Sequence, residues 1–131
     1  MLLSTVLLIS AGAVGAITGA LHGALLHRRV IPPLLDARGR ALVPAPPMRR
    51  MLIGLLHFST FAWISGGLAL IIAALFLPQA ARLMAGVLVG SQFLYGAVGN
   101  FASLRRLHPG WILMSLAAAA IVWGMWLDVG F

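Results

Sequence analysis

Four long apolar segments, separated by short stretches that hold nearly all of the charge, restrict the fold of this chain more than any other feature. They run over residues 2–27, 51–77, 80–104 and 111–127. A helix needs about 20 predominantly apolar residues to cross the hydrocarbon core of a bilayer. Only 8% of the residues are charged, against about 25% in soluble domains. The sequence therefore predicts an all-α, polytopic membrane protein: one domain, residues 1–131, folded as a four-transmembrane-helix bundle with short connections.

The limits of the segments support this interpretation. The first segment lacks a basic start, is longer than a signal-peptide core and is followed by two arginines in place of a cleavage site, so we expect a retained helix. Pro78 and the His-Pro-Gly sequence at 108–110 predict two short turns. The last three helices should therefore run antiparallel to their neighbours.

The basic residues, all of them arginine, predict the orientation in the membrane. Eight of the nine lie in the connections 28–50 and 105–110, whereas Arg82 lies on the other side. Under the positive-inside rule both connections face the cytoplasm, and both termini face the periplasm of a bacterial inner membrane. These arginines are expected to contact anionic lipid, another membrane subunit or a second copy of the chain, and not nucleic acid. The candidates are Arg28, Arg29, Arg49, Arg50, Arg105 and Arg106.

The basic connection 28–50 is rich in proline and shows no helical periodicity. Its Val-Pro-Ala-Pro-Pro sequence at 43–47 favours an extended, polyproline-like path. Two interpretations stay open for this cytoplasmic loop. It is either a stiff connector that lies on the lipid headgroups or a strap that docks a soluble partner.

Glycines suited to close helix contact recur in the first and third helices. Small residues at intervals of about four let two helix backbones approach closely. They serve either packing inside the bundle or contact with another subunit. The helix-packing positions are Gly15, Gly19, Gly23, Gly86, Gly90, Gly96 and Gly99.

Polar side chains from three predicted helices share one depth. His22, His57 and Asn100 each lie five to seven residues from an arginine of the basic side, or about 8–10 Å at about 1.5 Å per residue. Gln92 and Tyr95 continue this polar track along the third helix. In one interpretation, hydrogen bonds among these groups lock the bundle. In the other they bind a cofactor: His22 and His57 ligate a haem b iron from opposite faces, or His57 binds a quinone or a porphyrin.

Absent residue types exclude several kinds of chemistry. The chain has no cysteine, which excludes disulfides and thiol catalysis, and no lysine, which excludes a retinal Schiff base. No carboxylate is expected inside the membrane, which argues against proton- or cation-coupled transport. The serines lack a nearby His–Asp pair, so no catalytic residue is predicted.

Two parts of the sequence resemble known membrane proteins. His57, Trp63 and the glycine pair at 66–67 are similar to one helix of the copper-resistance D membrane proteins and of the four-helix, J-type protoporphyrinogen oxidases. That resemblance implies an association with haem in which His57 is a ligand. The sequences LHGALLHRRVIPPLL at 21–35 and RRLHPGW at 105–111 resemble small four-helix inner-membrane proteins of alphaproteobacteria. This second resemblance implies four helices and a bacterial inner membrane, and no particular activity.

Three functions are compatible with these features. The first is an accessory or structural subunit that joins a larger membrane complex, or a second copy, through its glycine-rich helix faces. The second is a membrane redox protein that binds haem b or a quinone through His22 and His57. The third is a small component of a transporter or channel.

Overall fold

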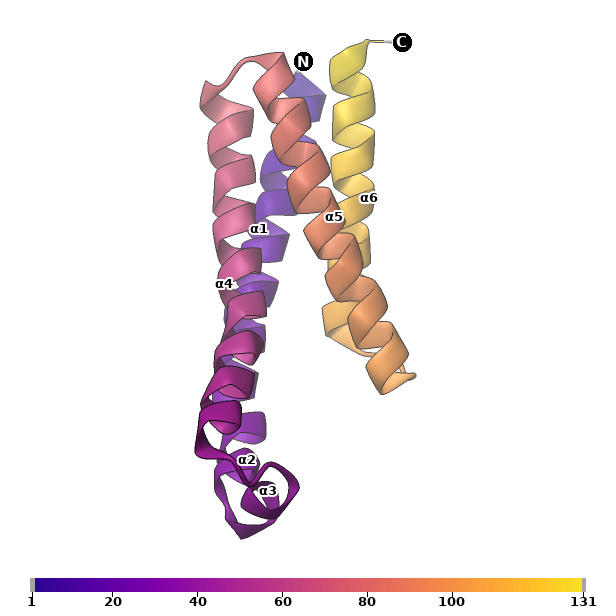
Figure 1. Ribbon diagram of the computed structural model, residues 1–131. Helices are drawn as coiled ribbons and strands as arrows, with labels where there is room; N and C mark the ends of the chain where they lie inside the picture. Colours follow the sequence, from indigo (N-terminus) through magenta and orange to yellow (C-terminus); the bar gives the residue numbers. More distant parts are fainter. Residues whose placement is uncertain (1, 131) are drawn as a thin grey trace.

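The computed structural model describes residues 2–130 of the chain, and every regular element among them is helical (Figure 1). The elements are α1 (Leu2–Leu25), a π-helix (Leu26–Val30), α2 (Ile31–Leu35), α3 (Ala37–Leu42), α4 (Pro46–Phe76), α5 (Gln79–Leu104) and α6 (Pro109–Val129). Four helical stretches are long and apolar enough to cross a membrane: the continuous one over 2–35, then α4, α5 and α6. The predicted all-α, four-helix membrane architecture is confirmed.

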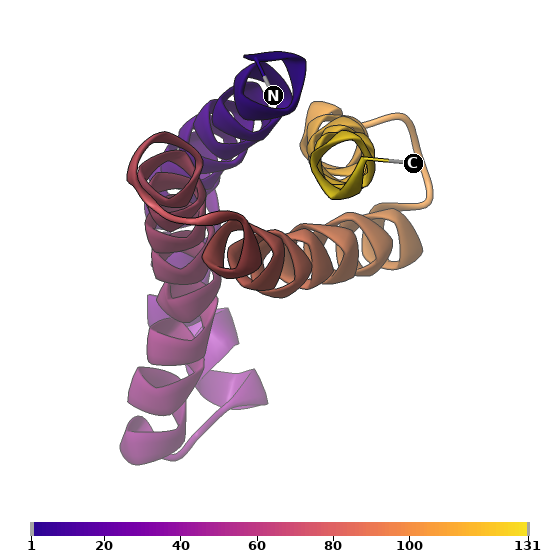
Figure 2. The same ribbon diagram turned by 90° about the horizontal axis from the view of Figure 1, so that it is seen from above.

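The four long helices form a ring in which each helix contacts the next (Figure 2). α1 packs against α4 and α6, and α5 closes the ring between α4 and α6. Consecutive long helices run in opposite directions, so that both described ends of the chain lie at the same end of the bundle (Figure 1). The turns at 77–78 and 105–108 are short, in agreement with the antiparallel arrangement that the sequence predicts.

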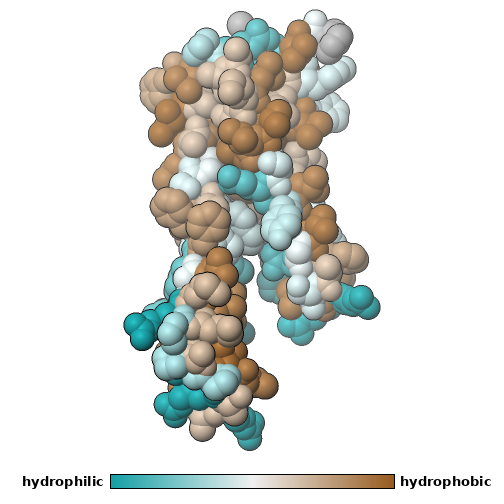
Figure 3. All heavy atoms as spheres, viewed as in Figure 1, coloured by the Kyte–Doolittle hydropathy of each residue, from teal (hydrophilic) through white to brown (hydrophobic). Residues whose placement is uncertain are grey.

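α1 and α4 project beyond the other two helices at the end opposite the termini. Their projecting ends carry α2 and α3, whereas α5 and α6 stop earlier and diverge from α4 (Figure 1). On the face shown in Figure 3, most of the polar surface lies near these lower ends, and the upper helices are mainly apolar. Phe58, Phe61 and Phe76 are more than half exposed. Such side chains suit a surface that faces lipid and not water.

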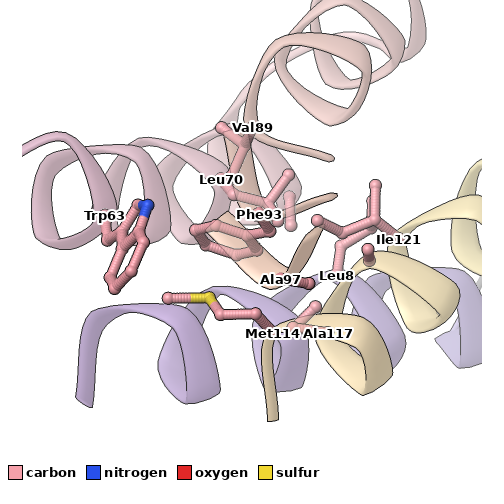
Figure 4. Close-up of a cluster of buried hydrophobic side chains, with 12 residues drawn as sticks. Leu8, Trp63, Leu70, Val89, Phe93, Ala97, Met114, Ala117 and Ile121 are labelled. Carbon is pink, nitrogen blue, oxygen red and sulfur yellow. The ribbon is translucent and has the colours of Figure 1, made fainter. Parts of the chain in front are cut away.

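Side chains from all four long helices meet in one core (Figure 4). Phe93 of α5 lies at the centre of this cluster and reaches across to α1. A Cβ atom at Gly15 would lie 1.9 Å from the Phe93 ring, so the ring occupies its place because Gly15 has no side chain. The large core side chains with almost no exposed surface are Leu8, Leu70, Phe93, Met114 and Ile121.

Six of the seven glycines predicted to mediate helix contact are used inside the bundle. Gly96, for example, accommodates the indole of Trp63, which would lie 2.5 Å from an added Cβ. The other contacts, besides that of Gly15, are Gly19 with Trp63 and Ile64, Gly23 with Thr60, Gly86 with Met125, and Gly90 with Ile121. Only Gly99 of the seven has no atom within 4 Å of the added Cβ. Packing inside the bundle therefore accounts for every predicted position except Gly99.

The connection 28–50 is mostly helical, although its sequence shows no helical periodicity. The extended path predicted at 43–47 is found only before α4, where residues 43–45 are not helical and Ala45 is extended. α1 continues through the π-helix into α2, and α4 already begins at Pro46. The proline pairs at 32–33 and 46–47 open α2 and α4. α4 begins after the extended residue Ala45, so the N–H groups that Pro46 and Pro47 lack would have no partner within the helix, and their absence costs nothing there.

Side-chain hydrogen bonds hold the tight turn between α2 and α4. Asp36 caps α3 by accepting a hydrogen bond from the backbone N–H of Gly39 at 2.9 Å. Arg49 donates from Nη1 to the carbonyl oxygens of Val43, at 2.8 Å, and Pro44, at 2.9 Å. Arg49 is thus engaged inside the chain. The other arginines proposed for lipid or partner contact are exposed, namely Arg28, Arg29, Arg50, Arg105 and Arg106.

A buried ion pair joins α5 to α6 near the chain ends. Arg82 Nη2 lies 2.6 Å from Asp128 Oδ1, and the two side chains are 13% and 1% exposed. Ser4 of α1 donates from Oγ to the same carboxylate oxygen at 3.1 Å, and Gln79 donates from Nε2 to the Asp128 carbonyl oxygen. This cluster connects three helices. It was not predicted from the sequence.

Removing the arginine of this pair should destabilise the protein strongly. Arg82→Met leaves a buried carboxylate without its partner, which should lower the free energy of unfolding by about 3–5 kcal/mol. The double variant Arg82→Met/Asp128→Leu should recover most of the loss. Unfolding in mixed micelles, followed by circular dichroism, measures both. Arg106→Gln is the exposed control and should stay within about 0.5 kcal/mol; a similarly small change in Arg82→Met would show that the ion pair does not stabilise the bundle.

Candidate functional site

Two adjoining cavities lie where α5 and α6 diverge from α1 and α4. The α1–α6 cavity has a volume of about 400 Å³ and the α4–α5 cavity one of about 410 Å³. His22, Trp63 and Asn100 line both and form the wall between them. The α1–α6 cavity also includes Thr18, Leu21, Leu25, Arg28, His108 and Leu113. The α4–α5 cavity also includes Phe58, Ser59, Gln92, Tyr95, Gly99 and Ser103.

His22 of α1 is positioned by two side chains of α4. Its Nε2 lies 3.3 Å from Ser59 Oγ, and its ring packs at a centroid distance of 4.7 Å from Trp63, tilted by 49°. The Ser59 hydroxyl has one proton and donates it to the Leu56 carbonyl oxygen at 2.8 Å. The tautomer of the imidazole decides which of the two groups, Ser59 Oγ or His22 Nε2, donates the hydrogen bond between them. Ser59 and Trp63 are four residues apart, so they share one face of α4.

The structure does not bring His57 to His22. His57 is half-buried and lines neither cavity. It is two residues from Ser59, which is about 200° around the helix from the face that contacts His22. The expected pair of histidines on opposite sides of a haem iron is therefore not formed. Within residues 2–130 there is also no group of three or more His, Cys, Asp or Glu side chains that could hold a metal ion.

Asn100, Gln92 and Tyr95 do lie together around the α4–α5 cavity, on the same side as His22. Asn100 donates from Nδ2 to the Gly96 carbonyl oxygen of its own helix at 2.9 Å. Its carboxamide therefore does not lock two helices together through this bond. Gln92 and Tyr95 are exposed, and Tyr95 is 83% accessible. Two of the three residues predicted to share one depth, His22 and Asn100, thus line one cavity together with Gln92 and Tyr95, which were predicted to continue the polar track; His57 does not line it.

Several residues of the two cavities were not predicted from the sequence. Ser59 and Trp63 replace His57 as the partners of His22. The spacing of Ser59 and Trp63 was visible in the sequence, but the rotation of α4 that turns them inwards was not. Thr18 also lines the α1–α6 cavity; it is 5% exposed, and its Oγ1 has no hydrogen-bond partner.

No protein-family model, curated protein or solved structure matches this chain. The fold defines its class as a four-span helical membrane protein. Any finer assignment depends on the chemistry of the two cavities.

A double-mutant cycle should detect the hydrogen bond between His22 and Ser59. The coupling energy between His22→Ala and Ser59→Ala should be about 0.6 kcal/mol and at most about 1.7 kcal/mol, the range of interhelical hydrogen bonds in membranes. The matched cycle between His22→Ala and His57→Ala should give a coupling near zero. Unfolding free energies in mixed micelles provide both values. Coupling in the second cycle and none in the first would contradict the described rotation of α4.

Proposed function

We propose that this chain is a multi-pass protein of a bacterial inner membrane that binds a quinone-like ligand in the α4–α5 cavity. Such a ligand is a lipid-soluble ring that carries hydrogen-bonding oxygens. The observation that supports this proposal is the composition of the cavity, where aromatic side chains and hydrogen-bonding groups from three helices line one hollow. The volume of about 410 Å³ lies within the range of small-molecule sites, about 300–1,000 Å³.

The aromatic and polar groups of the cavity match the two parts of a quinone. Phe58, Trp63 and Tyr95 provide surfaces against which a flat ring can pack. Asn100 uses one amide hydrogen for Gly96 and keeps a second hydrogen and its carbonyl oxygen. Gln92 adds another carboxamide. Because quinone oxygens accept hydrogen bonds, these amides and the tyrosine hydroxyl can hold the ring in one orientation.

Haem b fits the same cavity less well. An iron ligand must offer the lone pair of an imidazole nitrogen, and the Nε2 atom of His22 is already within hydrogen-bonding distance of Ser59 Oγ. His57 lies outside the cavity. The resemblance of α4 to haem-associated oxidases still makes a visible spectrum the appropriate control for any ligand assignment.

The proposed orientation follows from the distribution of arginines. Eight arginines lie at the end where α1 and α4 project, whereas Arg82 lies at the end that holds both termini. The positive-inside rule then places the projecting ends in the cytoplasm and the termini in the periplasm. Both cavities are consequently nearer to the cytoplasmic leaflet.

A short-chain quinone should bind the purified protein. Decylubiquinone should quench the tryptophan fluorescence, because Trp63 lines the cavity. Asn100→Leu should weaken the binding about three- to tenfold, the loss expected for one hydrogen bond. His57→Phe and Ser91→Ala change residues outside the cavity and serve as controls with unchanged affinity. Equal affinity in Asn100→Leu, or a Soret band that His57→Phe abolishes, would contradict the proposal.

A second function, that of an accessory subunit or homo-oligomer, is favoured by the exposed polar face of α5. Gln92 and Tyr95 are exposed on a membrane-spanning helix, where polar side chains normally face protein. Gly99 on the same face leaves room for another backbone. A carboxamide is both donor and acceptor, so Gln92 can pair with its own copy across a twofold axis. We therefore propose a second copy of the chain as the partner.

Engineered cysteines should report this contact between two copies, because the chain has no cysteine of its own that could form a competing disulfide. Gly99→Cys should form a disulfide-linked dimer in oxidised membranes, and adding Gln92→Leu should reduce its yield severalfold. Gly54→Cys is the control, because it is also an open position but lies on α4. Equal yields at the two positions would indicate random collision instead of a defined interface.

A further inference from the structure

The α1–α6 cavity lies across the wall of His22, Trp63 and Asn100 from the proposed quinone site, and its chemistry is different. One end holds Arg28, His108 and the first turn of α6. The His108 Nδ1 atom accepts a hydrogen bond from the Gly110 N–H at 3.0 Å, so that the neutral ring presents an N–H donor at Nε2. The first turn of α6 contains no acidic residue, and the partial positive charge of the helix N-terminus is therefore not offset. Three groups that attract an anion thus converge.

The chain has no acid left to neutralise this end of the cavity. Its two acidic residues are Asp36 and Asp128. Asp36 caps α3, and Asp128 is paired with Arg82 near the chain termini. Neither of them lines the cavity. The positive charge of Arg28 is therefore not paired with an acidic side chain of the cavity.

A second polar group lies deeper in the same cavity. Thr18 is 5% exposed, and its Oγ1 has no hydrogen-bond partner. It precedes Arg28 by ten residues on the same helical stretch, or about 15 Å along the axis. The side chains of Leu21, Leu25 and Leu113 line the cavity as well. The cavity therefore presents a cationic end, apolar walls and a buried hydroxyl that lacks a partner.

We infer that the α1–α6 cavity binds one anionic phospholipid. Its phosphate lies near Arg28, His108 and the N-terminus of α6, its acyl chain runs along the leucines, and Thr18 donates a hydrogen bond to an ester carbonyl. Because Pro109 has no N–H and the Gly110 N–H is bonded to His108, the N-terminus of α6 attracts the phosphate through its dipole, and Arg28 and the Nε2 atom of His108 provide the hydrogen-bond donors. The apolar walls favour a lipid over a free anion, because a small hydrated ion gains nothing from contact with leucine.

Lipid retention measured by native mass spectrometry tests this assignment with the full-length protein in detergent. The protein is mixed with equal amounts of phosphatidylglycerol and phosphatidylcholine, and the bound fractions are compared. Arg28→Gln should lower the preference for phosphatidylglycerol about fivefold, the effect expected for one arginine on an anionic lipid. Arg40→Gln removes an exposed arginine of α3 that is not part of the cavity, and the preference should be unchanged.

A second variant tests the contribution of the Thr18 hydroxyl separately from that of the Arg28 charge. Thr18→Val should weaken retention of both lipids alike, because both carry the ester and only one carries the net negative charge. Inorganic phosphate at millimolar concentration should not displace phosphatidylglycerol. The inference is overturned if Arg40→Gln reduces the preference as much as Arg28→Gln, if Thr18→Val retains both lipids fully, or if inorganic phosphate competes, which would identify a site for a free anion.

Discussion

The close approach of α1 to α4 is the contact on which the rest of the structure depends. A Cβ atom on Gly12 would lie 2.6 Å from the carbonyl oxygen of Gly67, and one on Gly67 would lie 2.4 Å from that of Gly12. The two backbones therefore touch, and neither position has room for a side chain. Lipid provides no hydrophobic force between helices, so association relies on contacts of this kind. With the two helices in contact at these glycines, which we call the glycine seam, Trp63 of α4 packs against His22 of α1. These two side chains are part of the wall between the two cavities.

The sequence allowed the architecture to be predicted because hydropathy and length determine which segments can span a bilayer. The number of spans, the short turns and the antiparallel order all followed from that constraint. The basic connection was predicted less well. The Val-Pro-Ala-Pro-Pro sequence at 43–47 was interpreted as extended chain, although Pro46 and Pro47 occupy the first turn of α4. Composition alone does not distinguish these two uses of proline.

For the candidate site, the sequence indicated the position of each polar residue along its helix but not the side of the helix that faces the neighbouring helices. Counting residues from the arginines grouped His22 with Asn100, and these two residues do line the same cavities, because the rise per residue is nearly constant. Which way a side chain points depends on how each helix is rotated in the bundle. The glycine seam decides that rotation for α4, and it turns Ser59 inwards in place of His57. The ion pair of Arg82 and Asp128 was not predicted either. The two residues are far apart in the sequence, and whether their side chains meet also depends on how α5 and α6 are rotated.

The unequal helix lengths have a consequence for where the basic residues lie. α4 has 31 residues and α6 has 21, a difference of about 15 Å at about 1.5 Å per residue. At the end opposite the termini, α1 and α4 consequently extend beyond α5 and α6. The extra length is not extra membrane span, because the projecting part of the chain holds six of the nine arginines, at 28–50, and charged side chains are costly in hydrocarbon. The difference in length between the helices therefore raises a basic platform on α1 and α4 beside the lower ends of α5 and α6.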